Sequence, residues 1–194
     1  MAGFTIMADI SQHIMKVLKT YLYPNYLQTS EAIRLVSPGD KNMDFQVGIF
    51  LYDIESLGND VASQVELDHS QGKQYPPKAL NLKYMIYINS KAQVAFQGED
   101  EQRFLGIIIQ ALHDNSVIDI KRIHTASDAF DMPTPIEMVN ISLDDKSKIW
   151  SSMGLAIQPC LYLEVSPILL ASKKVEPIQR VIGRDFQVQK AEEV

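Results

Sequence analysis

The stretch LNLKYMIYINS, residues 80–90, alternates between two kinds of side chain, and the rest of the chain can be placed around it. One set of positions is apolar throughout: Leu80, Leu82, Tyr84, Ile86 and Ile88. The intervening set is more polar and includes Asn81, Lys83, Tyr87 and Asn89. A period of two residues is typical of a β-strand with one face on a core. The stretch therefore predicts a strand over 80–90.

A second strand is expected over residues 45–54, FQVGIFLYDI, where it pairs most simply antiparallel with 80–90. Apolar side chains occupy both of its faces. One face holds Phe45, Val47, Ile49 and Leu51, and the other holds Phe50, Tyr52 and Ile54. Such a pattern favours a central strand that is covered on each side. A shorter strand is expected at Ala32–Val36, followed by a turn at Ser37-Pro38-Gly39-Asp40.

Two long helices are predicted from apolar residues spaced three or four apart. The first covers about 8–22, with Ile10, Ile14, Val17, Leu18 and Tyr21 or Leu22 on one face, and Pro24 ends it. The second covers about 99–113 and begins with acidic residues, which the helix dipole favours there. Its apolar face consists of Phe104, Ile108, Ala111 and Leu112, widened by Leu105 and Ile109.

The C-terminal half predicts three more strands and a short helix. Strands are expected at Val117–Ile123, Ile136–Leu143 and Gln158–Leu170, with Pro167 marking an edge or a bulge in the last. The run Met132-Pro133-Thr134-Pro135 is not expected to pair regularly. Asp144 is a suitable N-cap for a helix to about Met153, with Gly154 as its stop. These elements predict an α/β (α+β) fold with a mixed, mostly antiparallel sheet flanked by helices.

Two segments lack a clear pattern. The loop 55–78 ends in Tyr75-Pro76-Pro77, and its QVEL stretch near Val65 indicates an edge strand. After Ser172 the chain becomes polar, yet it keeps apolar residues: Val175, Ile178, Val181, Ile182 and Phe186. Residues 173–194 are therefore either a frayed tail or an arm that docks on a neighbouring subunit. The expected division is one domain over 1–172 and this tail or arm over 173–194.

Composition excludes several classes of protein. The chain has 194 residues, of which 46% are apolar, so it can form a core in a single domain. Its formal net charge is −6 and its basic residues are dispersed, which argues against a nucleic-acid partner. The N-terminus lacks a secretory pattern, and no apolar run is long enough to span a membrane. We therefore expect assembly in the cytoplasm, without direct membrane insertion.

Motifs that carry chemistry are missing from the sequence. It contains no GxGxxG, P-loop, GxSxG, HExxH or CxxC pattern. The histidines, His13, His69, His113 and His124, have no further His or Cys at a metal-ligand spacing. The single cysteine, Cys160, lies in an apolar run and is expected to be buried and unreactive. The sequence predicts no catalytic, cofactor-binding or metal-binding residue, and no enzyme.

A few residues permit a chemical interpretation beside a structural one. His113-Asp114 has the order of a base and its orienting carboxylate, but a histidine at a helix C-terminus is commonly a cap. Asp144-Asp145 could bind a divalent ion, although starting a helix explains the pair. Asp128 and Asp131 are expected to be solvated loop carboxylates. Trp150, the single tryptophan, is expected to pack on the sheet instead of forming a ligand platform.

The order of several short motifs is similar to a known family. They are Leu51-Tyr52, Pro76-Pro77, Tyr84, Leu105-Gly106, Leu112-His113-Asp114-Asn115, Trp150 and Tyr162-Glu164-Val165. In this order they resemble the tail-terminator, or cap, proteins of extracellular contractile injection systems, of the Photorhabdus virulence cassette and antifeeding prophage type. The resemblance extends over roughly residues 8–172.

The resemblance implies a structural role without chemistry. Such caps form a six-fold ring on the end of a tube and contractile sheath, which stops polymerisation and locks the last sheath layer. The implied partners are further copies in a homohexamer and the sheath and inner-tube proteins, in a particle that is released or membrane-anchored. A baseplate or adaptor component of the same particle is the alternative, and an unrecognised hydrolase is a third hypothesis from another class.

Overall fold

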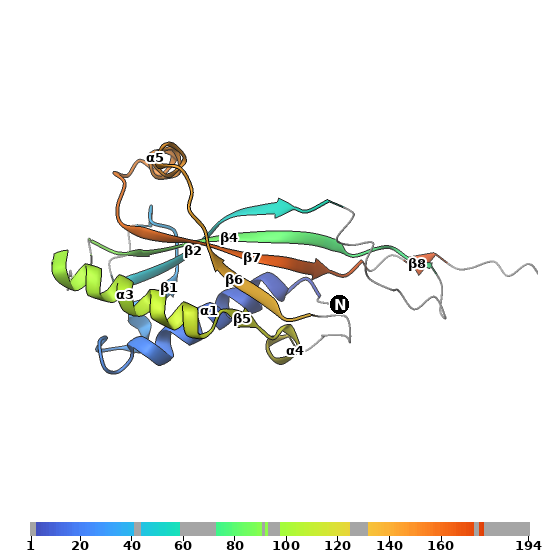
Figure 1. Ribbon diagram of the computed structural model, residues 1–194, viewed down its shortest axis with the longest axis horizontal. Coiled ribbons are helices and arrows are strands. Elements are labelled where there is room, and N and C mark those ends of the chain that lie inside the picture. Colours follow the sequence, from blue (N-terminus) through green and yellow to red (C-terminus); the bar gives the residue numbers. More distant parts are fainter. Residues whose placement is uncertain are drawn as a thin grey trace, which may run out of the picture.

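The computed structural model of the chain describes residues 3–40, 44–58, 73–90, 92, 98–124, 132–172 and 175–176. Within these residues a six-stranded sheet has the order β1-β2-β4-β7-β6-β5, and β3 pairs with β8 in a second sheet (Figure 1). The strands are β1 (Ile33–Leu35), β2 (Val47–Ser56), β3 (Lys73–Gln74), β4 (Lys78–Ile88), β5 (Val117–Ile118), β6 (Thr134–Met138), β7 (Cys160–Leu170) and β8 (Val175–Glu176). The helices are α1 (Ile6–Leu22), the 3-10 turn η1 (Ser30–Ala32), α3 (Gly98–Asp114), α4 (Ile120–Ile123) and α5 (Leu143–Ser152).

The strand with the clearest alternation, β4, lies at the centre of the large sheet. It pairs antiparallel with β2 on one side and with β7 on the other, so that Tyr84 lies between Leu51 and Leu163. The pairing of β1 with β2 is parallel, whereas β6 pairs antiparallel with β7 and β5 with β6. The prediction of a mixed, mostly antiparallel sheet is confirmed, as is the antiparallel pairing of the first two predicted strands.

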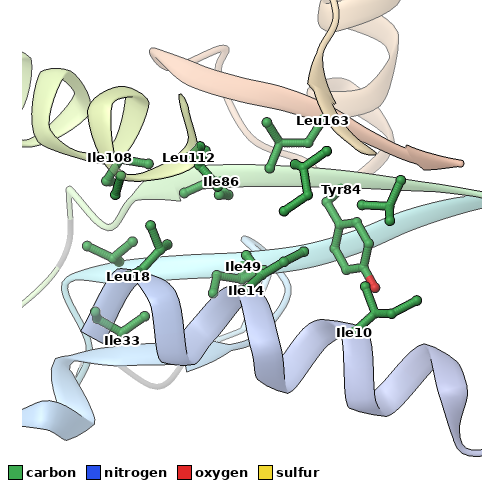
Figure 2. Packing of buried hydrophobic residues seen from close by; sticks show 14 of the residues in the cluster. Ile10, Ile14, Leu18, Ile33, Ile49, Tyr84, Ile86, Ile108, Leu112 and Leu163 are labelled. Carbon is green, nitrogen blue, oxygen red and sulfur yellow. The ribbon is translucent and has the colours of Figure 1, made fainter. Parts of the chain in front are cut away.

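The main core lies between one face of this sheet and the helices α1 and α3. Figure 2 shows Ile10, Ile14 and Leu18 of α1 pointing toward β2 and β4, with Ile108 and Leu112 arriving from α3. All three α1 side chains have no exposed surface. The Tyr84 hydroxyl reaches α1, where it lies 2.9 Å from the Ser11 hydroxyl. The apolar faces that the sequence predicts for α1, α3 and β4 therefore meet, although Ile109 remains 36% exposed.

Tyr84 gives the protein an expected sensitivity to alkaline pH. Burial raises the pKa of its hydroxyl from 10.0 to about 12. The unfolded chain ionises this group first, so its contribution to stability is complete below about pH 10 and is lost as the pH rises toward 12. Urea unfolding at neutral and alkaline pH should show a smaller alkaline loss for Tyr84→Phe than for the wild type. Tyr26→Phe, at an exposed position, is the control; an identical loss in Tyr84→Phe would contradict the prediction.

A second, smaller core lies on the opposite face, under α5. It consists of Phe45, Met85, Tyr87, Trp150 and Tyr162. Trp150 is 1% exposed, and its indole N–H donates to the Tyr162 hydroxyl at 3.2 Å. The predicted packing of Trp150 on the sheet is confirmed. In Figure 1 α5 stands on one side of the sheet and α1, α3 and α4 on the other, so the sheet separates two cores.

The course of β2 corrects two expectations. Phe45 belongs to the core under α5, whereas Val47 and Ile49 belong to the other one. Tyr52 is an extra residue in the pairing with β4, because Leu51 faces Tyr84 and Asp53 faces Lys83. Such a bulge turns the following residues over. The prediction of a central strand is confirmed for the first part of β2, which lies between β1 and β4, whereas the pairing with β1 extends only as far as Ile49.

Other corrections concern the C-terminal half. The N-cap of α5 is Ser142 instead of Asp144, because the Ser142 hydroxyl accepts the Asp145 N–H at 3.1 Å. Val117–Ile123 is not one strand: Asp119 caps the short helix α4 after two residues of β5. Pro135 does lie in a strand, on β6, which ends at Met138 and not at Leu143. Gly154 is confirmed as a helix stop, with φ of 70°.

Some predictions lie outside the described residues, namely the edge strand near Val65 and the carboxylates Asp128 and Asp131. Of the tail, the structure describes only Val175–Glu176 beyond Ser172. No described helix combines the length and the apolar character needed to cross a membrane.

Candidate functional site

The residues for which the sequence permits a chemical role do not lie together in one site. His113 lies exposed in the last turn of α3, and the Asp114 carboxylate accepts a hydrogen bond from the Tyr21 hydroxyl at 3.1 Å. Asp144 and Asp145 both pair with Lys148 in the first turns of α5. Burial raises the pKa of the half-buried Cys160 thiol, which makes it a poor nucleophile. Among the described residues, no group of His, Cys, Asp and Glu has metal-binding geometry.

The structure contains one histidine–carboxylate pair that the sequence does not indicate, because its two residues are far apart in the chain. His124, at the end of α4, is 3% exposed, and its Nδ1 lies 2.6 Å from the Asp9 carboxylate on α1. Its Nε2 accepts the backbone N–H of Gly3 at 2.9 Å. Both ring nitrogens are therefore occupied, which leaves no lone pair for a substrate. The pair connects the start of the chain and α4 to α1.

Replacing His124 should weaken the attachment of Gly3 and α4 to α1. His124→Phe keeps a ring in the cavity but removes the acceptor for the Gly3 N–H and the donor to Asp9. We expect a loss of about 1–2 kcal/mol in the free energy of unfolding, and faster amide exchange at Gly3 and along the first turn of α1. His113→Phe, at an exposed position, is the matched control. Equal stability of the two variants would show that the His124 contacts contribute nothing.

The most distinctive polar surface is a charged strip on the face of the sheet that carries α5. Its members come from four adjacent strands: Asp53 and Glu55 of β2, Lys83 of β4, Glu164 of β7 and Glu137 of β6. The register aligns Asp53 with Lys83, Lys83 with Glu164, and Glu164 with Glu137. In Figure 1 the ends of β2 and β7 extend away from α5, which covers the other end of this face. The strip contains four carboxylates and one ammonium group.

Lys83 neutralises only part of the negative charge of the strip. Its ammonium lies 2.9 Å from Glu55 and 3.5 Å from Asp53. The hydrogen bond to Glu55, together with the charges of Glu55 and Asp53, raises the pKa of Lys83, so the ammonium stays charged. Glu137 and Glu164 lie directly opposite each other, an arrangement of like charges that is unfavourable unless a cation intervenes.

Asn81 adds an unusual polar atom to the same face. It is 5% exposed and lies opposite Glu55, and its Nδ2 donates to Glu164 at 3.0 Å. Its buried carbonyl oxygen accepts no hydrogen bond from the described residues. A buried acceptor without a donor costs about 1–3 kcal/mol. The attraction of the strip for cationic groups comes instead from its exposed carboxylates, Asp53 and Glu55, which share the single ammonium of Lys83.

Comparison with known families accounts for the fold. The sequence model of the Pvc16 N-terminal domain matches residues 9–184, most of the chain. The chain belongs to this family. Together with the two solved terminator structures described next, this match confirms the expected resemblance to terminator proteins of contractile injection systems. The matched range includes the charged strip, the His124–Asp9 pair, the core under α5 and all buried residues of the main core except Ile6.

Solved structures share the architecture of this Pvc16 N-terminal domain. One is the sheath/tube terminator of PVC, an extracellular contractile injection system, in its extended state, with a TM-score of 0.57 and 20% identity over 96% of this chain. Another is the tube-terminating cap of the anti-feeding prophage, with a TM-score of 0.53 and 20% identity over 93% of this chain. The chain covers 65% and 61% of these two proteins. No curated protein sequence matches it.

Proposed function

We propose that the chain is a structural cap that terminates the tube and sheath of a phage-tail-like contractile injection particle. The observation that carries the proposal is the family match over residues 9–184, together with a fold shared with two terminators. The surface chemistry supports it, because the described residues offer charged and apolar contact groups instead of an open set of nucleophile and base. On this proposal the protein is not an enzyme and is assembled in the cytoplasm before it joins the particle.

The proposal is tested by the length of the assembled tubes. Tube and sheath proteins of the same particle are co-expressed with or without this chain, and the products are measured by negative-stain electron microscopy. We expect long tubes of variable length without the chain, and shorter, uniform ones with it. Immunogold labelling should place the protein at the end away from the baseplate. A baseplate or adaptor protein would instead label the baseplate end, and tube length would not depend on it.

A ring of six copies is the assembly state that we propose for the cap. A cyclic homohexamer joins one patch of each subunit to a different patch of the next. Residues 173–194 are the candidate contact with such a neighbour, since they follow β7, the last long strand, in the sequence and retain apolar residues. Mass photometry of the intact protein should give a hexamer, and deletion of residues 173–194 should reduce its mass. An unchanged hexamer would exclude the arm as the clamp between subunits.

A further inference from the structure

In the part of the chain that the structure describes, most of the β2 edge of the sheet has no strand paired with it. β1 pairs with Val47, Gly48 and Ile49, and the last backbone contact is the Val36 N–H, which donates to the Ile49 carbonyl at 3.0 Å. From Phe50 to Ser56, β2 has β4 on one side and no described strand on the other. The N–H and C=O groups along such an edge can pair with an added strand.

A hollow of about 240 Å³ lies where β1 stops. Leu35 at the end of β1 and Leu51 of β2 contribute apolar side chains to its lining, and Tyr84 and Ser11 also line it. Ile54 lies on the same face, because it is aligned with Leu82 of the main core, and it is 47% exposed. An added strand would continue the line of β1 and could place an apolar side chain in the hollow and another over Ile54.

The opposite face of the same edge carries the charged strip. Asp53 and Glu55 alternate with Ile54, and their side chains are 49% and 55% exposed. Side chains of an added strand alternate in the same way. Those that do not face the hollow would therefore lie beside Asp53 and Glu55, where Lys83 is the one ammonium for four carboxylates. Cationic side chains would be attracted there and acidic ones repelled.

The same features disfavour a second copy of β2 as the occupant. The bulge at Tyr52 and the acidic residues next to it are devices that protect an edge from unselective pairing. In addition, the Asp53 carboxylate accepts the Ile54 N–H at 2.9 Å, which occupies one backbone donor of the strand until a stronger partner displaces it. Two such edges side by side would bring their carboxylates together, whereas a basic segment would relieve the charge.

We propose that the β2 edge from Phe50 to Ser56 binds an extended segment of a partner protein that alternates apolar and basic residues. Its backbone adds to the sheet, its apolar side chains enter the hollow, and its lysine or arginine side chains pair with Asp53 and Glu55. The proposal does not depend on the function as a cap, because the edge, the hollow and the strip belong to this chain alone.

A synthetic peptide tests the proposal with the full chain. A fluorescein-labelled peptide of about ten residues alternating valine and lysine is titrated by anisotropy, beside an alternating valine–glutamate peptide and a lysine peptide with its valines in one block. We expect the alternating basic peptide to bind at least about tenfold more tightly than either. It should also slow amide exchange in the Phe50–Ser56 segment. Equal affinities, or unchanged exchange in this segment, would overturn the proposal.

Matched variants test whether peptide binding depends on the charged strip or on the overall negative charge of the protein. Asp53→Asn combined with Glu55→Gln removes two charges with little change of shape, and should weaken the basic peptide about tenfold. Glu31→Gln combined with Asp144→Asn removes the same charge at exposed positions elsewhere, and should leave affinity within about twofold. Equal weakening by both pairs would overturn the proposal. So would self-association of the protein with edge amides that already exchange slowly without peptide, since a second copy would then be the occupant.

Discussion

Trp150→Ala is expected to cost about 3–5 kcal/mol of the free energy of unfolding, the range for removing a large buried aromatic side chain. Trp150 is the one buried residue of α5. Its indole also packs edge-to-face on the Tyr87 ring, with ring centroids 6.2 Å apart, and donates to Tyr162. Truncation therefore removes the anchor of α5 and leaves a cavity over the sheet. Urea unfolding followed by far-UV circular dichroism measures the loss, and amide exchange in α5 should accelerate.

Two further variants identify the origin of that loss. Leu143→Ala also shortens an apolar side chain of α5, but Leu143 is 73% exposed, so stability should change by no more than about 0.5 kcal/mol. Trp150→Phe keeps an aromatic ring and removes the indole N–H. Its loss of stability should lie between those of Leu143→Ala and Trp150→Ala. If Trp150→Ala were as stable as Leu143→Ala, α5 would not depend on Trp150 for its position.

The sequence predicts those parts of the fold in which periodicity and burial agree. The alternation of β4 and the stripes of α1 and α3 identify the main core correctly, because each element has one face to bury. The sequence does not fix the end of an element where two neighbouring residues can both serve as its cap. Ser142 and Asp144 are both good N-caps, and only the geometry decides that the Ser142 hydroxyl accepts the Asp145 N–H while Asp144 occupies the first turn.

The polar features of the molecule depend on register, which a local pattern does not contain. The strip requires the bulge at Tyr52, which brings Asp53 and Glu55 onto the same face as Lys83. A partial signal was present, since Asn81 and Lys83 are polar positions in a strand whose alternate residues are buried. The contact between His124 and Asp9 had no local signal, because the two residues are 115 positions apart.

The same register gives the two faces of the sheet different roles. The face under α1 and α3 carries the main core and holds the fold together. The other face is divided: α5 and its aromatic cluster cover one part, and the charged strip occupies the part that α5 leaves. This division combines a rigid framework with an accessible polar surface, so substitutions on one face can change stability and those on the other can change the surface charge.

Gly48→Ala is the second substitution with a large expected effect, although it adds a single methyl group. Gly48 of β2 lies opposite Tyr87 of β4, and a Cβ atom at Gly48 would lie 2.2 Å from the Tyr87 ring. The ring has little freedom to move away. It is 3% exposed, packs edge-to-face on both Phe45 and Trp150, and donates its hydroxyl hydrogen to the Val36 carbonyl at 3.2 Å. We expect a loss of about 2–4 kcal/mol, since overpacking also breaks this hydrogen bond.

Gly106→Ala is the matched control, because a Cβ atom at Gly106 of α3 would meet nothing within 4 Å. In a helix this change should stabilise the protein by about 0.5–1 kcal/mol, so the same substitution is expected to have opposite signs at the two glycines. Trp150 is the single tryptophan, and its fluorescence reports on the Tyr87 ring beside it. Gly48→Ala should shift its emission to longer wavelength at temperatures where the protein is still folded. Unchanged emission and stability would mean that the Tyr87 ring does not occupy the space over Gly48.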